Sequence, residues 1–410
     1  MKLHFNTGFI VLLITALLLS AAGCERQGSD QADNKGNAPQ SDTDDRVRVT
    51  PSSIVDDYSG MINTVAETLN DPRYFHDGQW HEHFGDAYMY GPSFDLATAA
   101  LNGDVASYQR AVDVLNLDFV MVEKASANLG GLIDAFSDLE SVCMALLGLL
   151  ESGLFVQVPS FFEISQGLAE ILDLFAVLFD DYLPPDLGEF AGMTYGPTAI
   201  SSLLALLNLG LAMSGPEEQA DRYMARAHEV LEHIHQKAWS DELGAYRFAP
   251  EDGRLMLYPN STMMVAYGRA LMLEDNELYR ERIAATYEGI QPLRAESGDH
   301  YYSPYSREEA NAIDEDYATL SSQNYLMIGL WYAYAATGDQ RYLNDIDLIF
   351  GWLESHLFID GVLKHHWVNG RAADSEDLYE FCSGCNLQTL YIFRTIELEA
   401  CSEPSQCTPH

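Results

Sequence analysis

The stretch Tyr258-Pro-Asn-Ser-Thr, residues 258–262, decides the fold because openings of the same kind recur along the chain. Proline or a small hydroxyl residue suits the first turn of a helix, where backbone N–H groups lack partners. Related openings begin at residues 195, 321 and 382, so the intervals are 63, 63 and 61 residues. A repeat of this length predicts stacked helical hairpins, each of which buries its apolar face against the next hairpin.

The same spacing, followed toward the N-terminus, gives six units. Another opening, Tyr90-Gly-Pro-Ser, stands 105 residues before Tyr195, which is nearly two intervals. The apolar stretch Leu139–Leu150 falls near the middle of that gap and supplies the missing helix.

Two kinds of helix alternate in the predicted repeat. The openings lead into stretches that are apolar on nearly all sides, as in buried helices: 199–213, 263–273, 326–336 and 387–396. Between them lie amphipathic stretches with charged faces: 105–125, 166–179, 217–238, 278–290 and 342–357. Inner helices that alternate with outer ones, six times, predict an all-α fold, an (α/α)6 toroid over residues 51–400.

Long connections lead from each outer helix back to the next inner helix, and we expect them at one face of the toroid. Two of these connections predict small β-hairpins. In one, Tyr246-Arg-Phe and Leu255-Met-Leu-Tyr flank a Pro-Glu-Asp-Gly turn. In the other, residues 362–368 lead to Asn369-Gly370, a strong turn dipeptide. Because function concentrates on loops that a rigid scaffold holds, this face is the expected mouth of a cleft.

The N-terminus predicts export and a lipid anchor. Lys2 precedes an apolar run, Phe9–Leu19, that is too short for a permanent membrane span. Ala-Ala-Gly-Cys at residues 21–24 resembles the lipobox of bacterial lipoproteins, which implies cleavage after residue 23 and acylation of Cys24. A plain secretory signal with an incidental cysteine is the alternative. Residues 24–50 are polar and predict a disordered tether, and residues 401–410 form a tail.

The charge of the chain limits its partners. Sixty-two acidic residues stand against 22 basic ones, for a formal net charge of −40. A nucleic acid or polyanionic ligand requires clustered bases, and none appear in the sequence, so no nucleic-acid partner is expected. The spread of acids fits a solvated surface, and cation binding is the alternative.

Six cysteines in an exported chain permit disulfides. Cys385 and Cys401 lie near opposite ends of one predicted helix, roughly 24 Å apart at the helical rise, which is beyond disulfide reach. The predicted pairs are therefore Cys382 with Cys385, and Cys401 with Cys407. Cys143 lies in an apolar run and is expected to be a buried free thiol.

The pair Cys382-x-x-Cys385 also permits a redox or assembly role. The strand pattern of thioredoxin-type proteins is missing around it, and the helix length excludes a zinc site made of all four C-terminal cysteines. No metal site and no cofactor are predicted.

Three stretches resemble the six-hairpin glycosidase-like superfamily of (α/α)6 toroids. They are Ala238-Trp-Ser-Asp-Glu-Leu-Gly-Ala-Tyr-Arg-Phe, Asp316-Tyr-Ala-Thr-Leu and Tyr332-Ala-Tyr-Ala-Ala-Thr-Gly-Asp-Gln-Arg-Tyr-Leu. The resemblance covers roughly residues 52–400 and implies the toroid fold. Members include N-acylglucosamine 2-epimerases and several glycoside hydrolases, so the resemblance implies carbohydrate chemistry. No catalytic signature of a single family matches residue by residue.

Acidic residues near the expected mouth are the first catalytic candidates. Asp314-Glu-Asp316 precedes an inner helix, and mutual repulsion of neighbouring carboxylates raises the pKa of one of them toward that of a general acid. Asp316 and Asp314 are the main candidates, with Asp86 and Glu380 as possible partners. The alternative is that these acids cap helices or support loops.

Histidines are the second group of candidates. His300 and the pair His365-His366 lie in loops of the same expected face. The resemblance implies a role for them, because epimerases of the superfamily use histidines as acid and base. Neighbouring residues of a strand point to opposite faces, so only one of His365 and His366 can point inward. Structural histidines are the alternative.

Aromatic and amide side chains near the openings are candidates for binding a sugar. The aromatic candidates are expected to line the cavity, and the alternative is that they fill the core. The polar candidates, Asn386 and Gln388 included, are expected to bind hydroxyl groups, and the alternative is that they cap helices. The predicted substrate-binding residues are Tyr90, Tyr195, Tyr258, Asn260, Asn324, His366 and Trp367.

The sequence thus supports two main hypotheses. In the first, the protein is an envelope-anchored, carbohydrate-active enzyme, a glycoside hydrolase or a sugar epimerase, with a carbohydrate or small-molecule ligand at its mouth. In the second, the toroid is a non-catalytic scaffold that binds a glycan or a protein partner in the envelope. A redox role of the Cys382–Cys385 pair is a weaker third hypothesis, and it requires an exposed bridge.

Overall fold

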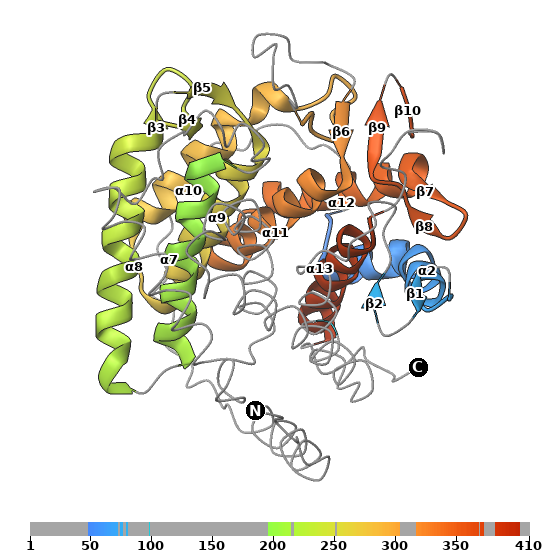
Figure 1. Cartoon of the computed structure of the whole chain (residues 1–410), viewed down its shortest axis with the longest axis horizontal. Helices are drawn as coiled ribbons and strands as arrows, with labels where there is room; N and C mark the ends of the chain where they lie inside the picture. The colour runs from blue at the N-terminus through green and yellow to red at the C-terminus, as the bar shows by residue number, and fades with distance from the viewer. Residues whose placement is uncertain are drawn as a thin grey trace, which may run out of the picture. The chain divides into compact units, whose positions relative to one another are not determined.

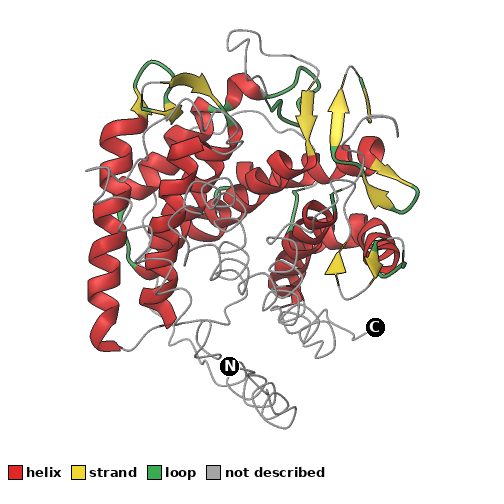
Figure 2. Cartoon of the chain, viewed as in Figure 1, coloured by secondary structure: helices red, strands yellow, loops and turns green. Residues whose placement is uncertain are grey.

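The computed structural model describes residues 48–72, 74–76, 79–80, 98, 196–214, 217–250, 252–303, 317–368, 370–372 and 382–401. The chain divides into two units, residues 1–48 and 49–410, and every element below belongs to the second. Helices dominate the described part, and short strands lie in its loops (Figure 2).

Four described helices form successive inner members of the ring: α7 (Gly196–Ser214), α9 (Leu257–Leu273), α11 (Leu320–Thr337) and α13 (Ser383–Cys401). Helix α9 packs against both α7 and α11, and α11 packs against α13. Most of their side chains are buried, polar ones included, as the apolar pattern predicted. All four begin within two residues of the openings at residues 195, 258, 321 and 382.

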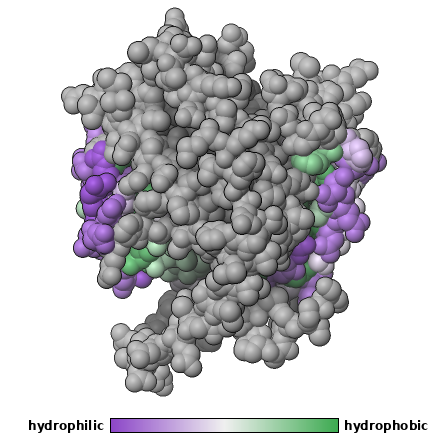
Figure 3. All heavy atoms as spheres, turned by 60° about the horizontal axis from the view of Figure 1, so that its bottom comes forward, coloured by the Kyte–Doolittle hydropathy of each residue, from purple (hydrophilic) through white to green (hydrophobic). Residues whose placement is uncertain are grey.

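The outer helices α8 (Glu217–Ala238), α10 (Glu277–Gly289) and α12 (Gln340–Trp352) each pack against the inner helix that precedes them. Between α11 and α12 the turn is tight, because Gly338 adopts a left-handed φ of 71° and Asp339 caps α12. Hydrophilic residues predominate where the described chain is visible in Figure 3, beside smaller hydrophobic areas. The predicted outer stretch 342–357 is not one α-helix, since a π-helical segment, η5 (Leu353–Leu357), follows α12.

The partner of the last inner helix comes from the other end of the chain. Helix α2 (Pro51–Leu69) packs against α13 and is not among the expected outer helices. Thr50 begins it with a capping box, in which Thr50 and Ser53 exchange side-chain-to-backbone hydrogen bonds. In Figure 1 this pair is the blue helix, α2, beside the dark red helix, α13. None of the described helices is long and apolar enough to cross a membrane.

The strands form small sheets in the loops. Strands β3 (Trp239–Ser240), β4 (Ala245–Ala249) and β5 (Asp252–Leu255) form one sheet in that order. A second sheet has the order β10 (Arg371–Ala372), β9 (His366–Val368), β6 (Tyr317–Thr319). Strand β7 (Phe358–Ile359) pairs with β8 (Val362–Leu363), and β1 (Phe75–His76) pairs with β2 (Gln79–Trp80). Strands β3–β6, β9 and β10 lie along the top of Figure 1.

Three details of the loops differ from the sequence expectations. The strand expected to run on from Leu255 ends there, because α9 already begins at Leu257. Residues 362–368 form two separate strands: β8, which pairs with β7, and β9, which pairs with β6. Tyr317–Thr319 is a strand rather than a helix opening, and the cap of α11 is Thr319, whose side chain accepts from the backbone N–H of Ser322. No acidic residue lies in the first turn of α11.

One amide side chain fixes each of three loops to the inner helix that follows. Asn260 donates to the backbone carbonyl of Tyr246 and accepts from its N–H. Gln323 makes the same two bonds to Tyr301. Asn386 makes them to Leu363. These three residues, 63 positions apart in sequence and completely buried, are called the amide clamps below.

Candidate functional site

Several predicted site residues lie outside the described residues. They are Asp86, Asp314, Asp316, Glu380, Tyr90, Tyr195, Cys24 and Cys407. Cys401 is the last residue of α13, and its side chain is likewise outside the description.

Three predicted substrate-binding residues make hydrogen bonds within the protein. Asn260 is an amide clamp, and Asn324 donates to the backbone carbonyl of Cys385 and accepts from Thr389. Both side chains are completely buried. Tyr258 is also buried, and its hydroxyl bonds to that of Ser321. Buried polar groups that are paired within the protein match the alternative considered for these residues, in which they fill the core or support helices.

His300 is held in a dyad with its neighbour Asp299. It lies in the loop between η4 (Gln291–Leu293) and the part of the chain that leads to β6. Its Nδ1 lies 2.7 Å from Oδ1 of Asp299. The loop itself is fixed, because Ala295 donates its backbone N–H to the carbonyl of His300 and the next residue, Tyr301, is held by an amide clamp.

The protonation of the dyad follows from its surroundings. Burial lowers the pKa of His300 below its usual value; Asp299 acts in the opposite direction, and His356 adds to the lowering. Burial raises the pKa of Asp299, but hydrogen bonds from Ser297 and His300 outweigh it and leave the pKa below its usual value. A carboxylate only accepts, so Nδ1 of neutral His300 carries the proton and Nε2 carries a lone pair.

The Nε2 atom of His300 is buried and has no hydrogen-bond partner in the described part of the chain. A buried nitrogen lone pair without a donor costs free energy, typically about 1–3 kcal/mol. A ligand proton donor at this atom would remove that cost. An imidazole with one nitrogen fixed by a carboxylate and the other open is the arrangement that proton transfer requires.

Aromatic rings lie against His300 of the dyad. The ring of His300 stacks on Trp352 with centroids 4.4 Å apart and an interplanar angle of 13°. Tyr302 meets His300 edge-on at 5.4 Å, and His356 meets Trp367 edge-on at 4.9 Å. These five residues, called the ring cluster below, come from the His300 loop, the end of α12, η5 and β9. The predicted substrate-binding residue Trp367 contacts Trp352, which stacks on His300, and the centroids of the two tryptophan rings are 6.0 Å apart.

The adjacent histidines of the last loop have different partners. His366 lies on β9, and its Nδ1 is 2.9 Å from the hydroxyl of Tyr317 on β6. His365 lies just before β9 and faces Cys385, with Nδ1 3.3 Å from Sγ. Burial holds the pKa of His365 well below its usual value, and His366 acts in the same direction.

Cys382 and Cys385 form the predicted disulfide at the start of α13. Cys382 is 2% exposed and Cys385 is completely buried. A redox enzyme must bring its disulfide to a partner's thiolate, so this burial counts against the hypothesis of thiol exchange with another protein.

Comparisons with known proteins give structural likenesses only. No family model and no curated protein sequence matches the chain. A GH76 α-mannanase from Bacteroides thetaiotaomicron superposes with a TM-score of 0.60 and 13% identity, over 86% of this chain and 100% of its own. A cellobiose 2-epimerase from Bacillus thermoamylovorans gives 0.58 and 10%, over 85% and 100%. A GH76 α-1,6-mannanase from Salegentibacter in complex with mannotetrose gives 0.56 and 10%, over 83% and 99%.

The chain has the (α/α)6-toroid fold of these solved structures. At 10–13% identity these likenesses establish the fold and leave the reaction open.

The sequence predicted roles for His300, His366 and Trp367, but three further residues of the dyad and the ring cluster were not predicted. Asp299 directly precedes His300, and an acidic residue next to a candidate base is a signal that the sequence offers. Trp352 and His356 lie in the predicted outer stretch 342–357, where amphipathic patterning points to packing. No sequence signal places them beside a loop that precedes them by about 50 residues.

Proposed function

We propose that the protein is a carbohydrate-active enzyme in which His300 transfers a proton. The Asp299–His300 dyad, with its open and buried Nε2, carries this proposal. The toroid supports it, because the similar solved structures include a mannanase and a cellobiose 2-epimerase. The ring cluster adds a second support, since aromatic faces pack against the apolar faces of sugar rings.

The dyad favours epimerisation or isomerisation over hydrolysis. A neutral imidazole oriented by a carboxylate suits removal of a proton next to a sugar carbonyl, followed by its return. Glycoside hydrolysis instead needs two carboxyl groups on either side of the scissile bond. The candidates for that pair, Asp316 with Asp314, Asp86 or Glu380, lie outside the described residues, so a hydrolase is the second outcome that the experiment must recognise.

The proposal includes a location in the bacterial cell envelope. Cys24 would carry the lipid, and residues 24–50 would connect it to the toroid as a flexible tether. The expected ligand is a carbohydrate, and a protein partner in the envelope belongs to the alternative in which the toroid only binds.

The test uses the full chain in mild detergent, with a panel of reducing sugars and oligosaccharides. Epimers and new reducing ends are measured together, for the wild type and for the His300→Gln and Asp316→Asn variants. Epimer formation that disappears in His300→Gln supports the proposal. New reducing ends that disappear only in Asp316→Asn would identify a hydrolase. No turnover with folded protein would leave the binding scaffold as the better hypothesis.

A further inference from the structure

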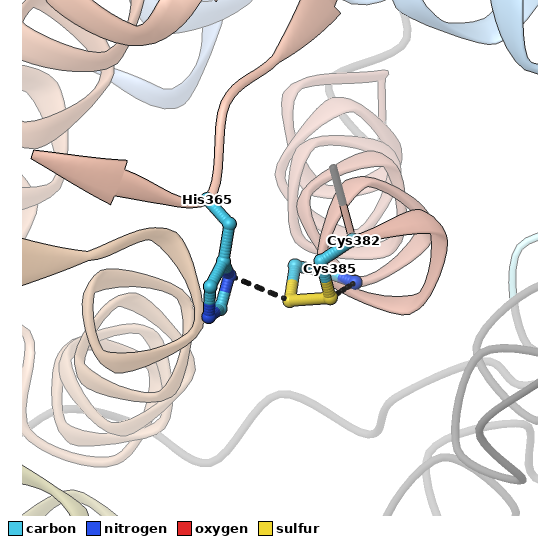
Figure 4. Close-up of side chains that lie close together, drawn as sticks. All are labelled: His365, Cys382 and Cys385. Carbon is cyan, nitrogen blue, oxygen red and sulfur yellow. Dashed lines mark hydrogen bonds between the residues drawn. A yellow bond between two sulfur atoms is a disulfide. The ribbon is translucent and has the colours of Figure 1, made fainter. Parts of the chain in front are cut away.

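Three donor side chains meet between two inner helices, outside the proposed proton-transfer dyad. The Nδ1 of His365 and the Sγ atoms of Cys382 and Cys385 all lie within 4.8 Å of one another. In Figure 4 the imidazole ring faces the disulfide at the start of α13. Both sulfur atoms belong to buried residues, and His365 is half-buried.

The backbone around these donors is already fixed. The carbonyl of His365 accepts from the N–H of Leu320, the first residue of α11. Two residues before His365, the amide clamp Asn386 holds Leu363. Because Asn386 directly follows Cys385, the strand that leads to the histidine and the helix that carries the cysteines are joined at the site. Ligands that are held before a metal arrives lose little freedom when it binds.

One contact within the cluster favours the thiolate form of a cysteine. The backbone N–H of Cys385 donates to Sγ of Cys382 at 3.1 Å. A hydrogen bond from a backbone N–H stabilises an anionic acceptor more than a neutral one. The N–H of Cys385 would therefore stabilise Sγ of Cys382 when that sulfur carries negative charge, as it does in a metal–thiolate bond.

We propose that reduction of the Cys382–Cys385 disulfide converts this cluster into a site for a thiophilic divalent cation of the zinc type, with His365 as the third ligand. Two cysteines separated by two residues, plus a histidine, are a common set of zinc ligands. In tetrahedral zinc the ligand atoms lie about 3.5–3.8 Å apart, given Zn–S near 2.3 Å and Zn–N near 2.0–2.1 Å. The Nδ1–Sγ distance of 3.3 Å is close to that geometry before any movement.

The conversion is balanced as follows. A small-molecule dithiol, rather than a partner protein, transfers two electrons and two protons to the bridge; the bond between Cys382 and Cys385 breaks, and the reductant becomes a cyclic disulfide. The cation then displaces both thiol protons and binds two thiolates. No fourth protein donor is present among the described residues at the cluster, so a water molecule would complete the tetrahedron.

His365 must change its tautomer during the conversion. A disulfide sulfur has no proton, so in the bridged state Nδ1 is the donor in the contact with Cys385. A metal requires the lone pair of Nδ1, which moves the proton to Nε2. The bridged and metal-bound states of the three side chains therefore exclude each other.

The test is a titration of the full chain with Co²⁺ or Zn²⁺ alone, after reduction and anaerobic removal of the reductant. We expect one ion per chain and the charge-transfer absorption of cobalt–thiolate bonds. The oxidised wild type should bind none at this site. In His365→Gln the affinity should fall at least about tenfold, since even the loss of an outer partner of a ligand has an effect of that size.

A Cys401→Ser/Cys407→Ser variant is the matched control, because it removes two thiols and leaves the cluster intact. It should bind one ion like the wild type. Cys382→Ser should lose the thiolate absorption; if this variant does not fold, the oxidised wild type and His365→Gln keep the test decisive. Absence of thiolate absorption in reduced, folded wild type, or equal affinity in His365→Gln, would overturn the proposal.

Discussion

In the loop before α9, Asn260 holds both backbone groups of Tyr246, and the hydroxyl of that tyrosine lies 2.9 Å from Nδ1 of His235 on the outer helix α8. In the loop before α11, Gln323 holds Tyr301 in the same way, and the hydroxyl of Tyr301 donates to Asp345 on the outer helix α12. Each of these places, where a loop meets the inner helix that follows it, is called a junction below. The two junctions are built alike, because in each an amide clamp pairs backbone groups that would otherwise be buried and unpaired.

The two junctions differ in the residues of their loops. Residues 239–256 contain no histidine, whereas the loop before α11 contains the Asp299–His300 dyad next to the ring cluster. The same clamp therefore holds the loop at both junctions, and the second junction adds a buried imidazole nitrogen, Nε2 of His300, that has no hydrogen-bond partner among the described residues. Chemistry in this toroid depends on loop residues that the repeat does not dictate.

The largest expected effect separates the junctions by activity. On the substrate that the sugar panel identifies, His300→Gln should lower turnover about 10²–10⁴-fold, since a positioned proton-transfer group contributes that much. The matched control is His235→Gln in the other junction, which should stay within about twofold. Comparable losses in both variants, measured by initial rates, would mean that the histidines support the fold alone.

The shared clamp predicts a loss of stability at either junction. Asn260→Leu keeps the size of the side chain but leaves the N–H and carbonyl of Tyr246 unpaired and buried. The free energy of unfolding should fall by about 3 kcal/mol, and Gln323→Met should cause a similar loss. Urea denaturation measures both, and Asn344→Leu on the exposed face of α12 is the control, with a change within about 0.5 kcal/mol. A clamp variant as stable as this control would refute the role.

Reduction of the disulfide should cause a smaller loss. The bridge closes a loop of only three residues' separation, so in the chain-entropy model it contributes about 2 kcal/mol. Denaturation with and without a dithiol should show that difference in the wild type and none in a Cys382→Ala/Cys385→Ala variant. If the double variant still responds to reductant, another bridge, such as the predicted Cys401–Cys407 pair, is responsible.

The pH dependence of activity should report the dyad. Because burial lowers the pKa of His300, the neutral base persists below pH 6.5, and the acid limb of the rate profile should have its midpoint below that value. Asp299 raises the same pKa, so Asp299→Asn should move the midpoint to lower pH while it reduces turnover. A midpoint above 6.5, or a shift to higher pH in the variant, would contradict the assignment.

The smallest expected effect is on stability in acid. The pKa values of His235 and His300 are both lowered, mainly by burial, so the unfolded chain binds more protons below about pH 6.5. Their contribution to the free energy of unfolding is complete above that pH and is lost as the pH falls through the pKa of the folded state. For each histidine this free energy changes by at most about 1.4 kcal/mol per pH unit. Half-buried His235 should contribute less than His300. Urea midpoints of the two His→Gln variants at pH 5 and 7 would show the order.

The sequence by itself determined the repeat and the kinds of helix in it. Helix starts at residues 196, 257, 320 and 383 follow from local patterns, because a first turn and an apolar period act over a few residues. The Cys382–Cys385 bridge was predictable for the same reason. Prediction failed at Tyr317–Thr319, where pairing with β9 across about 50 residues replaces the expected helix by a strand.

Only the tertiary structure decided which polar residues serve the fold and which remain for chemistry. Asn260 ends one predicted loop and His300 lies in another; the amide of Asn260 bonds to the backbone of Tyr246, whereas Nε2 of His300 has no hydrogen-bond partner among the described residues. The closure of the ring by α2 against α13 is likewise invisible in local patterns. The physical reason is that hydrogen-bond partners and ring contacts depend on which distant segments meet, and a sequence period specifies only the face that each segment buries.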